Sequence, residues 1–351
     1  MILLLHGAVR VSSFNRANDL INNILKPSEA DVGFFLNYLS KQGYIILMPF
    51  ADPKKRFDWV MNSFGNPRLN DTTRPNKTYQ SLVNVILRLK QSLNIDDSKI
   101  FAFGHSDGAD GAFCMSLFQP TIFAGFIVYN SMLLNFFSNI YLANTQNSNL
   151  YIVHSDLDDR RPIQQTRKVV EFLKARYNTI RYKEYKGYKH FDKHLIIDLP
   201  FANKFILSTK RNPFPTHIYK ESNNLQNDQC DWLRVNAFDL NLPKANWQTD
   251  FNFDSYDKID KSWRPLQYYV NEEGYAIKAN YHDNIFTIES SRATKMEIYI
   301  SEQMVDLSKA VKIFVNTKLV FNKLIGYSPT KNLLLLPLKE ASIDKCFSLT
   351  P

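Results

Sequence analysis

The first 215 residues alternate short apolar runs with stretches of helical periodicity. The apolar runs have the length and composition of buried strands and cover residues 2–7, 44–50, 99–104, 123–130, 149–155 and 180–187. The periodic stretches lie between them, at residues 32–43, 79–94 and 165–178. Continuous apolar strands that alternate with helices indicate a parallel sheet covered on both faces. The pattern therefore predicts an α/β domain with a mostly parallel, doubly wound sheet.

One predicted helix has a clear apolar face. Its apolar positions repeat every three or four residues, as an amphipathic helix requires, and they are Leu82, Val83, Ile86, Leu87 and Leu89. We expect this face to pack on the sheet.

The pattern changes after residue 215. The segment 211–219 contains two prolines and resembles a boundary between domains. Beyond it, apolar and polar residues alternate in short runs at 275–281, 285–290, 296–301, 311–316 and 332–338. Such alternation is typical of antiparallel strands with one buried face. We therefore expect an α/β domain over residues 1–215 and a smaller, all-β, sandwich-like domain over residues 216–351.

Composition supports a folded chain and argues against two kinds of partner. Of the 351 residues, 44% are hydrophobic and 14% aromatic, which is enough for a substantial core. The net charge of +9 is spread along the chain, with Lys54-Lys55-Arg56 as its densest run, so we expect no nucleic-acid partner. Residues 111–153 lack charged side chains, but Asn130, Ser131 and Asn135 interrupt them. We interpret them as a buried strand with its flanks and expect no membrane span.

The cysteines give no evidence of a metal or disulfide framework. Cys114, Cys230 and Cys346 are odd in number, far apart and without a C-x-x-C spacing.

Glycine is concentrated at one place. The chain has only 11 glycines, yet Gly104, Gly108 and Gly111 fall within eight positions after a predicted strand. The first two enclose Ser106 in the pattern G-x-S-x-G. This spacing suits a tight strand-to-helix turn, in which a strained serine presents its hydroxyl at the carboxyl edge of the sheet. We therefore predict that Ser106 is a nucleophile.

A serine nucleophile needs a base and an acid to orient that base. Asp156, Asp158 and Asp159 follow the strand predicted at residues 149–155, and His190 and His194 follow the last strand of the sheet. Both loops belong to the carboxyl edge, where Ser106 is expected. The chain order Ser, Asp, His is that of serine hydrolases with this type of turn.

Four segments together resemble the α/β-hydrolase superfamily, in particular its polyhydroxybutyrate-depolymerase-like and feruloyl- or acetyl-xylan-esterase-like branches. They are "LLLHGAVR", "FAFGHSDGA", "YIVHSDLDDRRP" and "YKGYKHF", within residues 3–191. In proteins of these branches, the loop that carries the acid often has the sequence pattern H-G-x-x-D-x-x-V-P. Aligning its ends with His154 and Pro162 implies Asp158 as the acid, with Asp156 as an alternative. Their base follows a glycine-containing turn, which implies His190.

The resemblance also implies an oxyanion hole and an N-terminal extension. The "HGAVR" loop would supply the backbone N–H of Ala8, with Val9 as a further donor, beside that of Asp107. Related proteins have two or more strands before this one and often an export signal, whereas Met1 begins directly on it. The compartment is therefore unknown: cytoplasmic as the sequence stands, periplasmic or secreted if a segment is missing. Two residues of the acid loop also depart from the pattern, Ser155 for glycine and Arg161 for valine.

Other polar residues have simpler interpretations. His190 and His194 have an i, i+4 spacing, but no glutamate pattern or third ligand accompanies them, so we expect no metal. His105 and His154 are expected to be structural, and Asp107 and Asp110 to complement the helix dipole. The residues left open, as packing or pocket-lining side chains, are Trp59, Asn130 and Ser131.

The sequence as a whole indicates a serine hydrolase without metal or cofactor, a carboxylesterase in the first place. Its substrate would be a small-molecule or carbohydrate-linked ester. The alternatives are a prolyl-oligopeptidase-like peptidase and a non-catalytic binding protein with a vestigial triad. The role of the β domain does not follow from the sequence.

Overall fold

The N-terminal part of the chain is built on one parallel sheet. A computed structural model describes residues 1–7, 31–50, 59, 77–132, 141–176, 180–225, 229–248, 252–257, 262–269, 274–325 and 332–337. Six strands pair in the order β2-β1-β3-β4-β5-β6, and every pair is parallel. Their bounds are Ile46–Leu47, Ile2–Leu5, Phe101–His105, Gly125–Tyr129, Leu150–Ser155 and Ile180–Tyr185, in that order.

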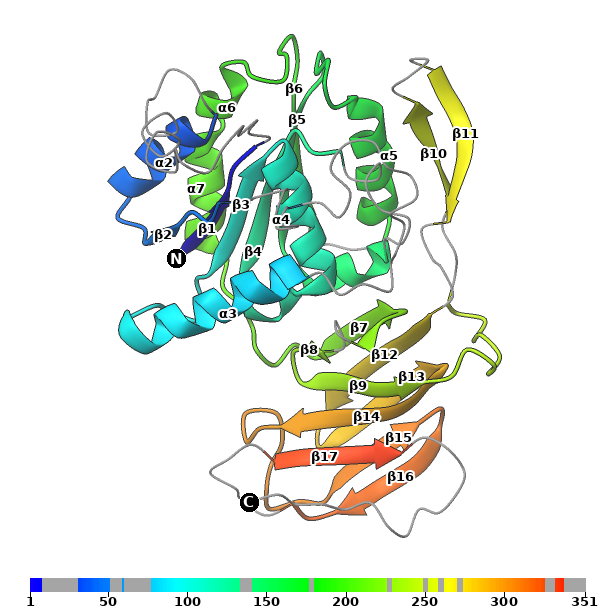
Figure 1. Cartoon of the computed structure of the whole chain (residues 1–351). Helices are drawn as coiled ribbons and strands as arrows, with labels where there is room; N and C mark the ends of the chain where they lie inside the picture. Colours follow the sequence, from blue (N-terminus) through cyan, green and yellow to red (C-terminus); the bar gives the residue numbers. More distant parts are fainter. Residues whose placement is uncertain are drawn as a thin grey trace.

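Helices cover both faces of this sheet (Figure 1). The helices are α2 (Asp31–Lys41), α3 (Lys77–Ser92), α4 (Asp107–Phe118), α5 (Ile163–Lys174), α6 (His194–Ile197) and α7 (Leu199–Ser208), with short 3-10 turns η4 (Pro120–Ile122) and η5 (Leu142–Asn147). One apolar core joins the sheet to α3, α4 and α5, and another joins it to α2, α6 and α7. Strands β1, β3, β4 and β5 are buried throughout, which explains their continuous apolar sequences. The predicted α/β-hydrolase fold is confirmed.

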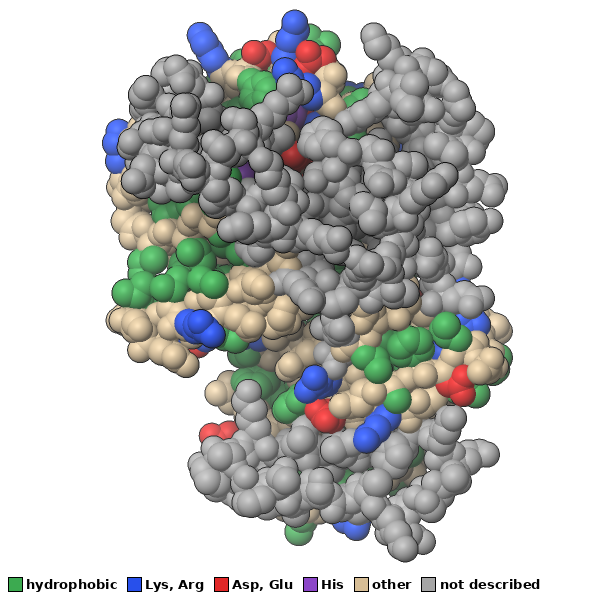
Figure 2. Space-filling model, viewed as in Figure 1, with side chains coloured by type: hydrophobic (Ala, Val, Ile, Leu, Met, Phe, Trp, Pro, Cys, Tyr) green, Lys and Arg blue, Asp and Glu red, His purple; other side chains and the backbone are tan. Residues whose placement is uncertain are grey.

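The apolar face of α3 is narrower than predicted. Leu82, Val83 and Ile86 are buried, and Leu89 packs against the same core. Leu87 is instead 42% exposed, so its assignment to the buried face was wrong. Val85 is equally exposed, and Figure 2 shows hydrophobic side chains on the surface over this helix. The buried stripe therefore follows a single i, i+1, i+4 row.

The C-terminal part is all-β, as predicted. One sheet has the order β16-β15-β13-β12-β7 and the other β17-β14-β9-β8, with β10 and β11 as a separate pair (Figure 1). The bounds of β7 to β11 are His217–Ser222, Gln229–Cys230, Leu233–Phe238, Asn252–Asp257 and Ser262–Tyr269. Those of β12 to β17 are Tyr275–His282, Ile285–Ser291, Ala293–Ile300, Val311–Val315, Lys318–Lys323 and Asn332–Pro337. One apolar cluster draws buried residues from both sheets. The prediction of purely antiparallel strands was wrong at one pair, because β13 and β15 run parallel.

Two asparagine side chains of η5 join the two parts of the chain. Asn144 accepts a hydrogen bond from the backbone N–H of Glu221 at 2.8 Å and donates to its carbonyl at 2.9 Å. Asn147 makes the same pair of contacts with the backbone of Tyr219, at 3.1 and 2.5 Å. Tyr219 and Glu221 lie two residues apart on β7, the last strand of its sheet, so the two amides pair with its edge as a further strand would. The boundary at residue 215 stays a prediction; it falls between the end of α7 and the start of β7.

No helix within the described ranges has both the length and the apolar character needed to cross a membrane.

Candidate active site

Ser106 lies at the turn between β3 and α4 and has an unusual backbone conformation. Its φ of 57° and ψ of −124° are rare for a residue with a side chain. Neighbouring hydrogen bonds hold it there, because Ser106 N donates to Tyr129 O and Asp110 N donates to Ser106 O, both at 3.0 Å. Such a conformation costs on the order of 1–3 kcal/mol and persists only where the surroundings enforce it. This is the strained turn that the glycine spacing predicted.

The two glycines around Ser106 make the turn sterically feasible. A Cβ added to Gly104 would lie 2.2 Å from the backbone carbon of Gly108. A Cβ added to Gly108 would lie 2.0 Å from the carbonyl oxygen of Leu5 in β1. Gly111 allows a third close approach, since its Cβ would lie 2.7 Å from Cβ of Trp59. The sheet, the turn and the first turns of α4 therefore pack in direct backbone contact.

The structure joins Asp158 and His190. His190 Nδ1 donates to Asp158 Oδ2 at 2.7 Å, and both side chains are buried. The other carboxylate oxygen accepts the backbone N–H groups of Arg160 and Arg161 at 2.9 and 2.8 Å. These bonds hold the acid in its loop, fix the tautomer of His190 and leave its Nε2 as the acceptor. Nε2 is buried and makes no hydrogen bond in the described part of the chain.

The two ionisable groups have shifted pKa values. Burial alone would raise the pKa of Asp158, but hydrogen bonds from His154 and His190 hold it well below its usual range. Burial lowers the pKa of His190 to about 4, against the opposing effect of Asp158. At neutral pH the pair is therefore a carboxylate beside a neutral imidazole, which is the state that accepts a proton at Nε2.

Asn130 connects this pair to His194. It follows β4 directly, has a φ of 49°, and donates from Nδ2 to Asp158 Oδ2 at 2.8 Å and to Ser155 Oγ at 2.7 Å. Its Oδ1 must then accept, and it receives the Nε2–H of His194 at 3.1 Å. His194 thus contacts the amide and not the carboxylate. Of the two histidines named as base candidates, His190 is the one that contacts the acid.

The alternative acid lies elsewhere. Asp156 Oδ1 accepts the backbone N–H of Gly187 at 2.7 Å, a contact within the loop region after β5 and β6. His154, which was expected to be structural, donates from Nε2 to the carbonyl of Arg161 at 2.8 Å and accepts from Thr166 Oγ1 at 2.9 Å. His105 donates to the carbonyl of His190 at 3.0 Å, and its ring lies 4.6 Å from that of His190.

Arg161 links the acid loop to the start of α4. Its guanidinium forms ion pairs with Asp107 and, at 3.0 Å, with Asp110 Oδ2. Asp110 Oδ1 also accepts Ser131 Oγ and the backbone N–H of Met132, both at 2.7 Å. The side chains of Asp107 and Asp110 were expected to complement the helix dipole; the structure adds a buried cation that pairs with both. Burial nevertheless raises the pKa of Asp110, against the effect of Arg161.

Several predicted features are not brought together by the described residues. Ala8 and Val9 lie outside them, and no hydrogen bond joins Ser106 Oγ to His190 Nε2. Trp59 is buried and donates from Nε1 to the carbonyl of His6 at 2.9 Å, which is a packing role. Within the described ranges, no group of three or more His, Cys, Asp or Glu side chains is placed to hold a metal ion.

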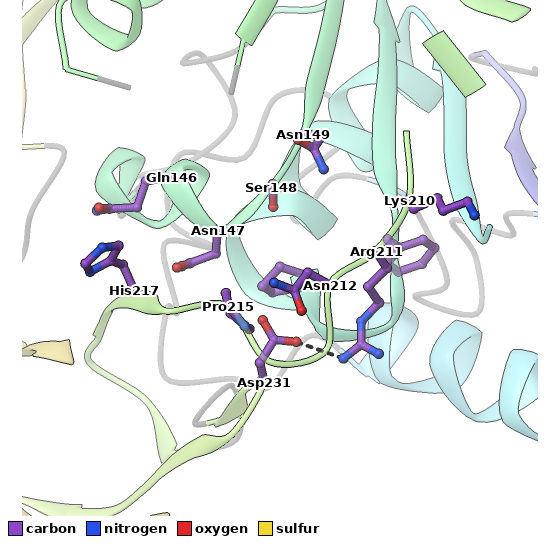
Figure 3. A pocket seen from close by; sticks show the side chains of 12 residues that line it. Gln146, Asn147, Ser148, Asn149, Lys210, Arg211, Asn212, Pro215, His217 and Asp231 are labelled. Carbon is purple, nitrogen blue, oxygen red and sulfur yellow. Dashed lines mark hydrogen bonds and ion pairs between the residues drawn. The ribbon is translucent and has the colours of Figure 1, made fainter. Parts of the chain in front are cut away.

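A cavity of about 300 Å³ lies at the opposite edge of the sheet (Figure 3). Phe123 and Asn149 in its wall precede β4 and β5, whereas Ser106 follows the end of β3, so the cavity is remote from the triad candidates. Arg211 Nη2 pairs with Asp231 Oδ1 across it at 2.8 Å. Burial raises the pKa of Asp231 to about 6 despite this partner. Residues from both parts of the chain line the cavity, among them Asn149 and Asp231.

Solved esterases are distantly similar in fold. A thermostable esterase gives a TM-score of 0.44 at 18% identity, over 60% of this chain and 54% of that one, so this chain spans about half the length of that esterase. SOBER1 from Arabidopsis thaliana gives 0.39 at 18%, over 59% and 96%. Est1E from Butyrivibrio proteoclasticus gives 0.38 at 16%, over 59% and 86%. No family profile matches the chain, and no curated protein matches it. The fold itself is an α/β domain with a six-stranded parallel sheet and a tight strand-to-helix turn at Ser106.

Proposed function

We propose that this protein is a serine hydrolase, most specifically a carboxylesterase of the polyhydroxybutyrate-depolymerase-like or feruloyl/acetyl-xylan-esterase-like kind. One observation carries the proposal: a serine in a strained backbone conformation ends the strand next to β4, and the loops after β4, β5 and β6 carry a buried Asn–Asp–His hydrogen-bond chain. A strained serine at the carboxyl edge of a parallel sheet is the arrangement that activates a hydroxyl for acyl transfer.

The proposed mechanism is acyl transfer through Ser106, with His190 as the base and Asp158 as the acid that orients it. Ser106 Oγ attacks the ester carbonyl while His190 Nε2 takes its proton, and Asp158 stabilises the imidazolium that forms. The backbone N–H of Asp107, with that of Ala8, binds the developing oxyanion; one such donor is worth roughly 3 kcal/mol. His190 then returns the proton to the leaving alcohol. Water, activated by the same histidine, releases the acid from the acyl-enzyme.

The absence of a Ser106–His190 hydrogen bond fits a free enzyme. Catalytic hydrogen bonds are often long without substrate and tighten in the Michaelis complex. Because Nε2 of His190 is buried and without a partner in the described ranges, it has no competing donor to release before it accepts the serine proton.

The test is hydrolysis of p-nitrophenyl esters from acetate to octanoate, with Ser106→Ala beside the wild type. Ser40→Ala, on the exposed surface of α2, is the matched control. We expect turnover and fluorophosphonate labelling in the wild type and the control, and neither in Ser106→Ala. The chain-length profile then gives the size of the acyl pocket. Cleavage of peptide p-nitroanilides but not of esters would favour a peptidase. If neither substrate turns over and the folded wild type is not labelled, the protein is a non-catalytic binder.

A further inference from the structure

Arg161 is a buried cation at the end of the acid loop. It directly precedes Pro162 and helix α5, and its side chain is about one-twentieth exposed. The guanidinium is directed toward α4, where it pairs with the carboxylates of Asp107 and Asp110. Both carboxylates lie in the first turn of that helix, immediately after Ser106. A planar guanidinium holds two carboxylates in a fixed geometry, which a flexible ammonium group does less well.

The backbone of the same residue holds the acid. Its N–H donates to Asp158 Oδ1 at 2.8 Å, and its carbonyl accepts the Nε2–H of His154 at 2.8 Å. The backbone of Arg161 therefore fixes the loop around Asp158, while its side chain fixes that loop to the helix that begins after Ser106. No other described residue combines a backbone hydrogen bond to Asp158 with an ion pair to α4.

The charges at this place also matter for an oxyanion. Asp107 and Asp110 bring two negative charges close to Ser106, and the N–H of Asp107 is the proposed oxyanion donor. In a buried site, an uncompensated carboxylate would oppose a developing negative charge nearby. Arg161 compensates one of the two charges, and the hydroxyl of Ser131 with the N–H of Met132 stabilises Asp110 from the other side.

We infer that Arg161 is a positioning residue: it fixes the acid loop against the nucleophile turn and compensates one of the two carboxylate charges beside the oxyanion hole. The inference rests on the proposed function, because it assigns Arg161 a part in the same acyl transfer. Arg161 does not touch the reacting atoms and acts through Asp107, Asp110 and Asp158.

The test compares Arg161→Met and Arg161→Lys with Arg167→Met. Arg167 lies on α5 and pairs with Glu184 at the surface. Arg167→Met therefore also removes an arginine ion pair, but it leaves the candidate active site unchanged. With p-nitrophenyl acetate we expect kcat of Arg161→Met to fall by roughly 100-fold, the effect of an active-site misplacement of about 1 Å. KM should change little, Arg161→Lys should recover part of kcat, and the control should match the wild type.

A pH profile separates positioning from a loss of stability alone. The titratable and charged groups around His190 are Asp158 and Arg161 of the acid loop and His105 of β3. Because the cation of Arg161 lowers the pKa of His190, its removal should move the acidic limb of kcat/KM to higher pH. If the variant only loses stability, the amount of active enzyme falls but the acidic limb of kcat/KM stays at the same pH.

A double variant keeps the test decisive if Arg161→Met fails to fold. Arg161→Met with Asp110→Asn removes one of the two carboxylates that Arg161→Met leaves without their cation, and circular dichroism checks the folding of the double variant. Because this variant loses one positive and one negative charge, its criterion is kcat and not the acidic limb: a reduced kcat in the folded double variant supports the inference. Wild-type kcat in the folded double variant overturns it and leaves the proposed function intact. No turnover by the wild type overturns the proposed function, and the inference with it.

Discussion

Replacing Asp158 by asparagine changes one atom of the site and should affect both stability and rate. The carboxylate accepts four short hydrogen bonds, two at each oxygen: Arg160 N and Arg161 N at Oδ1, and His190 Nδ1 and Asn130 Nδ2 at Oδ2. His154 Nε2 makes a longer contact with Oδ2, at 3.4 Å. An amide nitrogen cannot accept, so either orientation of the asparagine leaves two donors without an acceptor. At about 1–3 kcal/mol for each unsatisfied donor, Asp158→Asn should lower the free energy of unfolding by about 2–6 kcal/mol.

The rate should fall by far more than this stability loss. If the amide nitrogen faces His190, the imidazole turns to the wrong tautomer, and Nε2 no longer accepts the proton of Ser106. The same substitution in a serine protease lowers kcat by about 10⁴-fold, and we expect a similar loss here. Urea unfolding measures the first effect. Initial rates with p-nitrophenyl acetate, corrected for the folded fraction, measure the second.

Asp156→Asn is the matched control. Its Oδ1 accepts only the N–H of Gly187 within the described residues, so we expect less than about 1 kcal/mol of destabilisation and nearly unchanged turnover. If Asp158→Asn keeps wild-type turnover while Asp156→Asn loses it, the acid is Asp156 and the reasoning from the hydrogen bonds is refuted.

Three further predictions concern packing, domain contact and pH. Gly108→Ala should destabilise by about 1–3 kcal/mol or prevent expression, since its Cβ would lie 2.0 Å from a backbone oxygen of β1. Gly187→Ala should lower the free energy of unfolding by only about 1–2 kcal/mol, because an added Cβ meets open space there and only the φ of +80° is unfavourable. Equal destabilisation of the two alanine variants in thermal unfolding would contradict the role of the backbone contact at Gly108. The double change Asn144→Ala and Asn147→Ala should speed proteolysis between α7 and β7, because buried backbone groups of β7 lose their partners; unchanged cleavage would argue against amide pairing. Finally, kcat/KM should stay level from pH 7 to about 5 and fall as pH drops through about 4, where His190 is protonated. An acidic limb with its midpoint near pH 6.5 would show that burial does not determine the pKa of His190.

Local signals made the sheet and the strained turn predictable. Strands such as β3 and β4 are buried on both faces, so their apolar runs stand out without any knowledge of their neighbours. Gly104 and Gly108 mark the turn because backbone contact there excludes a Cβ. Chain order and the position of strand ends then indicated which loops carry Asp158 and His190.

The surrounding network depends on distant parts of the chain and was harder to predict. The partners of Arg161 are 54 and 51 residues earlier, and nothing local distinguishes it from its neighbour Arg160. Asn130 was left open as a pocket residue; its place directly after a buried strand was the available signal, and its positive φ is seen only in the structure. The choice between His190 and His194 required the orientation of two rings, one in the loop after β6 and one at the start of α6, which spacing alone does not fix.

The hydrogen bonds from Asn144 and Asn147 to β7 also affect the solubility that we expect of a fragment without the N-terminal part of the chain. A strand at the rim of a sheet exposes a row of N–H and C=O groups that invite pairing with another molecule. Here the side chains of Asn144 and Asn147 occupy two such positions. A fragment that begins after residue 215 would lose both asparagines and leave this rim open, so it is a poor choice for separate expression and prone to self-association. We therefore expect the η5 turn, which precedes residue 215, to limit self-association through this edge of the sheet.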